Sequence, residues 1–307
     1  MSERAPHSAE YLGAPRDFWW NHDYLELLAR RFDFAAVASA LDVGAGIGHW
    51  GMLLASVLPG DASIVGLERD PRWVAEADRR RAEREDSTRF RFEHGVAEEL
   101  PYQDGSFDLV TCQTLLMHVP DPQLVIGEMV RVTRPGGLVL AAEPNNRVSV
   151  VVETSVSARA HLDAKLAAIR FLLLYERGKL LLGEGNLSVG DLVPGYFAAA
   201  GLTQIETYMN DKASFAVAPY GDERQRVEAA QRAAFSERGL WGGIPREEAA
   251  RYFVAGGGRE DEFDPIWSGL LAQQKSEVDS AGRGELHTAG GDIHYLVSGR
   301  RPVTGST

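Results

Sequence analysis

Residues 41–48 read Leu-Asp-Val-Gly-Ala-Gly-Ile-Gly, and this stretch lies between an apolar run and a segment with helical spacing. Glycines at such a strand-to-helix turn let the backbone approach a ligand closely and permit positive φ angles. The free N–H groups at the start of the following helix are available to an anion or a polar ligand. The sequence therefore predicts a ligand site at Gly44, Gly46 and Gly48.

The spacing of these glycines limits which ligand the turn holds. A dinucleotide-binding fingerprint has the spacing G-x-G-x-x-G and would need glycine at position 49, which is His49. Glu68 follows Gly48 by twenty residues, at the end of the next expected strand. A carboxylate at that place can accept two hydrogen bonds from a ribose diol. The turn and Glu68 together predict a ligand that contains a ribose and disfavour a pyrophosphate.

Strand-like and helical segments alternate through the first half of the chain. The expected strands are 36–43, 62–67, 89–94, 107–113 and 138–143, and the expected helices are 17–34, 49–58, 71–85 and 122–133. Such alternation predicts an α/β fold with a Rossmann-like, doubly wound, mostly parallel sheet and helices on both faces.

The last part of the chain is expected to complete a seven-stranded sheet. Residues 293–298 carry apolar side chains on both faces, which suits the interior of a helix-covered sheet. We therefore expect this strand to lie antiparallel beside 138–143, with 203–209 as the edge strand. A rival prediction makes 213–218 the final strand and leaves 285–307 as a peripheral hairpin that turns at Gly290-Gly291.

The domain boundaries follow from these breaks in the pattern. The expected parts are an N-terminal lid segment (1–35), a core (36–146), a helical cap insertion (147–190), a return to the core (191–218), a helical insertion (219–284) and a terminal hairpin with the final strand (285–307). The stretch FLLLYERGKLLL in the cap is apolar on several faces and must be buried. A cover over an apolar substrate, a contact between two copies of the chain and packing on the core all remain open.

Composition excludes several classes of protein. The 307 residues are 44% hydrophobic and 25% charged, as in globular proteins, and the net charge is 32 − 44 = −12, which disfavours nucleic acid as a partner. The single cysteine, Cys112, forms no internal disulfide, and no apolar stretch suggests a signal peptide or a membrane span. We therefore expect a cytoplasmic protein, and the absence of a clustered Cys/His pattern predicts no metal site.

Several motifs resemble those of class I S-adenosylmethionine-dependent methyltransferases, of the methyltransferase-11/25-like, small-molecule type. LDVGAGIG is similar to the first motif of that family, and VGLERD (65–70) is similar to the second. The segments 95–122 and 131–144 resemble the part of the family that runs from the third strand to the fifth. The resemblance covers about 36–144 in the right order and implies S-adenosylmethionine as the cofactor.

The resemblance also implies which residues hold the cofactor. Glu68 would bind the ribose, and Asp42, Gln113 and Thr114 would lie near the methionine end. The adenine would lie at Val96 and Ala97, where Val96 replaces an acidic residue common in the family. The full implied set is Asp42, Gly44, Ala45, Gly46, Gly48, Glu68, Arg69, Val96, Ala97, Gln113 and Thr114.

Methyl transfer from an activated sulfonium needs in-line contact with the acceptor, and a general base only if the acceptor must lose a proton. His118, after the strand 107–113, is the candidate base. The candidate contacts to a small-molecule acceptor are Trp19, Trp20, Glu143, Asn145 and Asn146. Two other functions stay open, namely a nicotinamide-dependent oxidoreductase and a non-catalytic cofactor-binding protein, and a homodimer is also open.

Overall fold

The computed structural model describes Arg16 and residues 19–303, so most of the predicted lid segment lies outside the described residues. Its main sheet has seven strands in the order β3-β2-β1-β4-β5-β9-β6. The strands are β1 (Ser39–Val43), β2 (Ser63–Glu68), β3 (Phe90–His94), β4 (Phe107–Gln113), β5 (Thr133–Pro144), β6 (Thr203–Met209) and β9 (His294–Arg300). The predicted doubly wound fold is confirmed.

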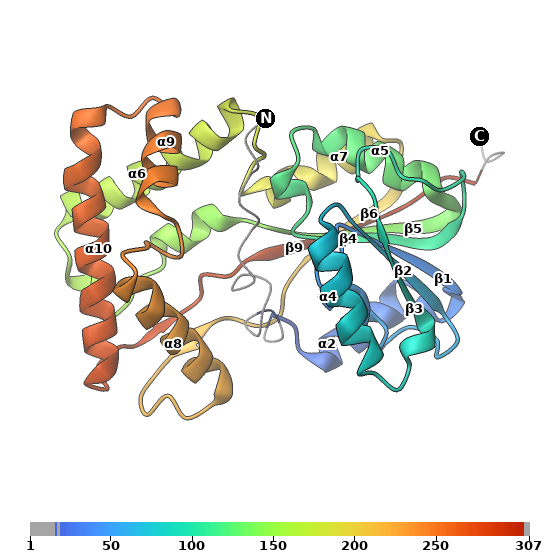
Figure 1. Cartoon of the computed structure of the whole chain (residues 1–307), viewed down its shortest axis with the longest axis horizontal. Helices are drawn as coiled ribbons and strands as arrows, with labels where there is room; N and C mark the ends of the chain where they lie inside the picture. Colours follow the sequence, from blue (N-terminus) through green and yellow to red (C-terminus); the bar gives the residue numbers. More distant parts are fainter. Residues whose placement is uncertain (1–15, 17–18, 304–307) are drawn as a thin grey trace.

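Helices cover both faces of this sheet, with α5 and α7 above it and α2 and α4 below it in Figure 1. The helices are α2 (His22–Arg31), α3 (His49–Leu54), α4 (Pro71–Ala82), α5 (Pro122–Val132) and α7 (Val193–Ala199). Both α4 and α5 begin with proline after an aspartate, and the side chains of Asp70 and Asp121 accept hydrogen bonds from backbone N–H groups of the first turn.

The central position of β9 confirms the expected topology. β9 pairs antiparallel with β5 on one side and with β6 on the other. Leu296 and Val297 are both fully buried, one in the core below the sheet and the other in the core above it. A strand with apolar side chains on both faces is therefore enclosed by helices on both sides, as the alternation predicts.

The predicted terminal hairpin is wrong. Residues on either side of Gly290-Gly291 do not pair with each other: β8 (Thr288–Ala289) pairs with β7 (Phe215–Ala216) in a separate two-stranded sheet. Both glycines have φ near +108°, namely 109° and 107°, a region that L side chains rarely adopt. They let the chain leave β8 and enter β9 in the main sheet.

The remaining helices form a second body beside the sheet (Figure 1). These are α6 (Leu162–Leu181), α8 (Glu223–Glu237), α9 (Arg246–Ala255) and α10 (Glu260–Gly282). The expected helical cap insertion begins with two short 3-10 turns, 146–151 and 157–159, and α6 follows them. Phe171 of α6, Phe253 of α9 and Phe263 of α10 form an aromatic core with Trp267.

The apolar segment of the predicted cap insertion packs against other helices of this second body. Helices α6 and α9 approach closely at Gly178 and Gly256, where a Cβ would lie 1.8 and 2.0 Å from backbone oxygens of the partner helix. One face of α6 is therefore packed inside the molecule, while Leu166 and Leu173 on another face stay exposed. Within the described residues, no helix has the length and apolar character that crossing a membrane requires.

Candidate functional site

The glycine turn lies at the carboxyl ends of β1 and β2, where ligands gather in open α/β sheets. Gly44, Gly46 and Gly48 all have positive φ, at 71°, 54° and 80°. A Cβ on Gly44 would lie 2.6 Å from the Leu115 side chain, and one on Gly48 would lie 2.5 Å from the ring of Phe92. The turn therefore requires glycine for its backbone conformation and for its close contacts. Ala45 packs into the core beneath it.

Glu68 ties this turn to the end of the next strand. One carboxylate oxygen accepts a hydrogen bond from the Gly46 N–H at 2.9 Å, and the other accepts one from the Asp70 N–H at 2.9 Å. A carboxylate has about four lone-pair positions, so both oxygens retain the capacity to bind a ligand hydroxyl. The structure thus places Glu68 beside the glycines, as the spacing predicts.

A row of buried polar side chains without partners marks the same edge of the sheet. Within the described residues, Oδ1 of Asp42, both amide atoms of Gln113, Nδ1 of His294 and Nε1 of Trp20 have no hydrogen-bond partner. Asp42 is 1% exposed, Gln113 4% and His294 5%. Unpartnered buried polar atoms are costly, so such a group points to a ligand or to ordered water.

Strand alternation puts this row on one face of the sheet. Ala40, Leu109 and Leu296 belong to the core below the sheet, and Asp42, Gln113 and His294 stand an even number of residues away on β1, β4 and β9. All three are at the edge formed by the carboxyl ends of β1, β4 and β5, because His294 lies opposite Pro144. The row therefore lines a single strip of the edge.

Aromatic side chains and one arginine cover this strip. The Trp19 ring lies 4.3 Å from the His294 ring, centre to centre, and the Arg16 guanidinium lies 5.3 Å from the centre of the Trp19 ring. Trp20 is buried and packs against Trp50 of α3. The sequence did not indicate Arg16 or His294. Only the register of β9 against β5 would have placed His294 at this edge.

Burial shifts the pKa values of these groups. It raises the pKa of Asp42 to about 7, although the Gly51 N–H opposes the shift. It lowers the pKa of His294 to about 4, with a further contribution from the Arg16 charge. It also lowers the pKa of Arg16 to about 10, while Asp42 and Glu143 act in the opposite direction. At neutral pH the imidazole is neutral and the arginine is charged.

The other predicted cofactor residues surround the same edge. Thr114, directly after β4, has φ 52°, a conformation that is uncommon for threonine and is typical of functional sites. Val96 is exposed and Ala97 is buried, in the loop that follows β3. Arg69 is exposed, and its carbonyl accepts a hydrogen bond from His94 if Nε2 carries the proton.

Glu143 has a different place from the one predicted. Its side chain is fully buried, and its carboxylate accepts hydrogen bonds from the N–H groups of Leu115, Leu116 and Met117 at 2.8 to 3.3 Å. Burial raises its pKa to about 7. Glu143 lies at the end of β5, where a side chain can point to either face of the sheet, and here it points into the protein. We therefore reassign Glu143 from acceptor contact to anchor of the loop after β4.

The two asparagines after β5 are also engaged within the protein. The Asn145 amide donates to Asp191 at 2.8 Å, and the Asn146 amide donates to the Leu187 carbonyl at 2.6 Å. They hold the segment that returns from α6 to the sheet, so the structure gives both a structural task. His118 ends the loop that Glu143 anchors and is partly buried.

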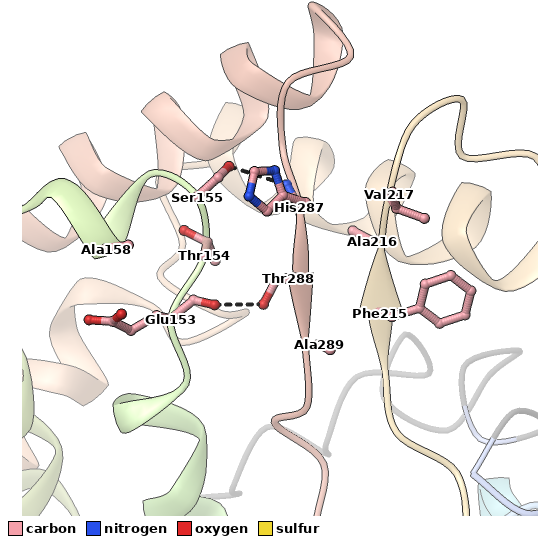
Figure 2. Close-up of a pocket in the computed structure, with 10 residues that line it drawn as sticks. All are labelled: Glu153, Thr154, Ser155, Ala158, Phe215, Ala216, Val217, His287, Thr288 and Ala289. Atoms are coloured by element: carbon pink, nitrogen blue, oxygen red, sulfur yellow. Dashed lines mark hydrogen bonds between the residues drawn. The ribbon is translucent and has the colours of Figure 1, made fainter.

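A separate recess lies between the sheet and the helical body (Figure 2). It has a volume of about 480 Å³ and is lined by residues 153–155, Ala158, 215–217 and 287–289. Thr288 donates a hydrogen bond to the Glu153 carbonyl there, and the His287 N–H donates one to Ser155. None of the unpartnered polar groups of the sheet edge lines this recess, which lies where three chain segments cross between the two bodies.

The sheet order brings the glycine turn and Glu68 together at the carboxyl ends of the strands of an α/β protein, where ligands gather in such folds. Residues 36–179 match a family model described as a methyltransferase domain. These residues, slightly less than half of the chain, are therefore similar to methyltransferase domains.

Curated relatives are similar in sequence to part of the chain. A demethylmenaquinone methyltransferase of Shouchella clausii is 35% identical over 124 residues, which are 40% of this chain and 51% of the relative. The same enzyme of Oceanobacillus iheyensis is 33% identical over 124 residues, 40% of this chain and 50% of the relative. The chain therefore spans about half the length of the curated relatives it matches.

A solved structure agrees in fold. The YcgJ protein of Bacillus subtilis is 18% identical, with a TM-score of 0.50 over 92% of this chain and 99% of that one. S-adenosylmethionine is the cofactor that the methyltransferase match implies, and the residues at the sheet edge fit it. The glycine turn leaves room for close backbone approach, Glu68 has lone pairs for a ribose diol, and Asp42 and Gln113 keep buried polar atoms for an amino acid group.

Proposed function

We propose that this protein transfers a methyl group from S-adenosylmethionine to a small-molecule acceptor. The observation that carries the proposal is the strip of unpartnered buried polar atoms beside the glycine turn and Glu68. An oxidoreductase is not favoured, because His49 occupies the position that the dinucleotide fingerprint reserves for glycine. A non-catalytic binding protein would share the site but would not consume the cofactor.

The chain's own residues are proposed to act mainly by binding and orientation. Bound S-adenosylmethionine supplies an activated methyl group on its sulfonium. Glu68 holds the ribose, Val96 and Ala97 lie along the adenine, and Asp42 and Gln113 hold the methionine end. Holding two reactants in line accounts for much of such a rate. His118 is the proposed proton acceptor if the acceptor loses a proton during transfer.

The acceptor site is proposed to lie above the ends of β4 and β5, under Trp19 and near the loop 115–118. Helices α8, α9 and α10 lie outside the residues that the family model matches. The relatives named above act on demethylmenaquinone. A reduced demethylmenaquinone is therefore the first acceptor to assay, and small phenols and amines follow.

Calorimetry with S-adenosylhomocysteine, S-adenosylmethionine and NAD tests the cofactor. We expect S-adenosylhomocysteine to bind with a micromolar dissociation constant, about −8 kcal/mol. NAD binding more tightly than S-adenosylhomocysteine would overturn the proposal. Transfer of label from methyl-tritiated S-adenosylmethionine to an acceptor then separates an enzyme from a binding protein.

Gly46→Val tests the glycine turn. The backbone at Gly46 has φ 54°, and a β-branched side chain there restricts the backbone and occupies space at the turn. We expect the variant to fold and to lose binding of S-adenosylhomocysteine. Gly60→Val is the control, because a Cβ at Gly60 meets no atom within 4 Å. Normal affinity in a folded Gly46→Val protein would contradict the role of the turn.

A further inference from the structure

A stripe of leucines runs along α6, on the side of the helix that faces away from the aromatic core of the helical body. Its four leucines are each between 48% and 63% exposed, namely Leu162, Leu166, Leu173 and Leu180. The half-buried Ile169 lies among them, so the apolar residues follow one another at steps of four, three, four and seven. Such steps place side chains in one line along a helix, as in a seam between two helices. At 1.5 Å per residue this leucine stripe is about 27 Å long.

The two flanks of the leucine stripe differ. On one flank, Leu172 and Lys179 are buried within their own chain. On the other flank, three charged residues are exposed and repeat every seven positions, namely Asp163, Arg170 and Arg177. Only this charged flank is available to another molecule. It carries an acid at the start of the helix and bases further along.

The stripe is interrupted once, at Glu176. This carboxylate is buried and accepts hydrogen bonds from Arg147 and from the Ser188 hydroxyl, both at 2.6 Å. Its charge is therefore satisfied within its own chain and does not oppose an apolar partner on the stripe.

A second copy of α6 complements the stripe in an antiparallel arrangement. In an antiparallel pair of helices, the charged flank of one copy would face the charged flank of the other. In a parallel pair it would face the buried flank, which is not accessible. The antiparallel register would place Ile169 against the partner's Leu173 and Leu162 against the partner's Leu180. Each contact would then occur twice, because such an interface is symmetric about a two-fold axis.

The same register brings opposite charges together. Asp163 would lie beside the partner's Arg177, and the symmetry gives this pair twice. Arg177 donates one N–H to the Gly256 carbonyl at 2.9 Å, and the guanidinium has further donors. Arg170 would lie near the two-fold axis, but its charge is paired with Glu262 of its own chain at 2.8 Å, which reduces repulsion between the copies. Antiparallel helix dipoles also attract each other.

A membrane surface would also accept exposed leucines. The net charge of −12, however, opposes approach to an anionic membrane. A second copy is favoured because it complements both the leucines and the alternating charges of the flank.

We infer that the leucine stripe of α6 is the contact surface of a symmetric homodimer, in which two α6 helices pack antiparallel. The stripe is one helix wide, so it buries less than the about 800 Å² per partner of a standard interface. The dimer is therefore reversible, with an expected dissociation constant of about 10 to 100 µM. The glycine turn and Glu68 take no part in this contact, so the inference does not depend on the proposed methyl transfer.

Sedimentation velocity of the full chain, from about 1 µM to about 300 µM, measures the association. We expect a monomer at the low end and a dimer at the high end. Leu173→Glu puts a charge against the partner's Ile169 and should weaken association more than 10-fold, that is by more than about 1.4 kcal/mol. Leu124→Glu, at an exposed leucine of α5, is the matched control and should associate as the wild type does. Circular dichroism verifies that both variants fold.

Exchange of the flanking charges tests the antiparallel register. Asp163→Arg would face the partner's Arg177 with a like charge and should weaken association about 3- to 10-fold, the scale of two surface ion pairs. Arg177→Asp should have a similar effect. The double variant restores opposite charges and should associate within about twofold of the wild type. A double variant as weak as the single ones would refute the antiparallel arrangement.

A cross-link tests the position of the two-fold axis. Arg170→Cys places two thiols near the axis, and a short bismaleimide should link them into a covalent dimer. Arg30→Cys, at an exposed arginine of α2, should stay monomeric, and the buried Cys112 should not react. A wild-type protein that stays monomeric up to about 300 µM refutes the inference. A monomer that floats with phosphatidylcholine vesicles would assign the leucine stripe to a membrane surface instead.

Discussion

The helical body buries aromatic rings against one another, whereas the edge of the sheet buries polar atoms that have no partner. Phe171, Phe253 and Trp267 fill the first region with apolar contacts. Within the described residues, every buried side-chain polar atom of α6, α8, α9 and α10 has a hydrogen-bond partner. At the sheet edge, by contrast, Asp42 and Gln113 have buried polar atoms without a partner. The first arrangement favours stability, and the second sacrifices stability in favour of binding.

Because of this difference, we expect variants in the two regions to have different effects. A change in the sheet should affect the whole fold or the ligand, and a change in the helical body should affect stability alone. The four predictions that follow test that separation, beginning with the one of largest expected effect.

Ending the chain at Gly284 removes β8 and β9. Because β9 lies between β5 and β6, its loss exposes the hydrogen-bonding edges of both strands. We expect insoluble protein, as judged by expression and by circular dichroism of any soluble fraction. A chain that ends at Val303 keeps the strand and is the control. A shortened chain that stays folded and binds S-adenosylhomocysteine would show that β9 is dispensable.

Phe171→Ala opens a cavity in the helical body. The ring is fully buried, so we expect a loss of about 3–5 kcal/mol in the free energy of unfolding, measured with a chemical denaturant. Leu166→Ala, at an exposed position of the same helix, should change stability by less than about 0.5 kcal/mol. The affinity for S-adenosylhomocysteine should stay within twofold. A fall in affinity for the folded variant would mean that the two regions are coupled.

Glu68→Ala removes the carboxylate that reaches both the glycine turn and the expected ribose. We expect binding of S-adenosylhomocysteine to weaken by about 1.5–3 kcal/mol, the scale of hydrogen bonds to a charged group. Titration calorimetry measures it. Glu85→Ala removes an exposed carboxylate just beyond α4 and should have no effect. A change below twofold in Glu68→Ala would reduce Glu68 to a structural residue.

The buried carboxyls predict a pH dependence of stability. Glu143 has a pKa of about 7 in the folded protein against an ordinary value of 4.5, so the folded state binds more protons than the unfolded state between these values. Its contribution to stability is complete below pH 4.5 and is lost as the pH rises through 7, and Asp42 acts in the same direction.

Urea unfolding at pH 5.5 and pH 8 measures this loss, which we expect to be about 1–2 kcal/mol for Glu143. Glu143→Gln has no titrating group at this position, so its stability should vary less between the two pH values. A variant with the same pH dependence as the wild type would contradict the assignment of the shift to Glu143.

Local pattern was sufficient to predict the sheet. The alternation of apolar residues in 293–298 indicates a strand buried on both faces, and such a strand has few places in a doubly wound sheet other than the interior. The hairpin prediction failed because Gly290-Gly291 was taken for a two-residue turn. β8 pairs with β7, which is far away in the sequence, so the residues around either strand do not predict this pairing.

The site was predicted only in part, for a related reason. Gly44 and Gly46 directly follow β1, and Glu68 ends the next strand, so their spacing along the chain is visible in the sequence. The alternation of β5 does not say that Glu143 turns inward to three N–H groups of the neighbouring loop. Likewise, His294 reaches the edge only through pairing across β5 and β9, and Arg16 only through its contact with Trp19.

The place of β9 has a consequence for how the chain acquires its structure. The strand follows β6 in sequence only after α8, α9 and α10, yet it separates β5 from β6 in the sheet. On a growing chain β5 can pair with β4, but neither β5 nor β6 can pair with β9 until the whole helical body has been synthesised. Such non-local closure is slow and leaves strand edges open to other chains. The sheet that carries the binding site is therefore expected to be completed only after the helical body has been synthesised.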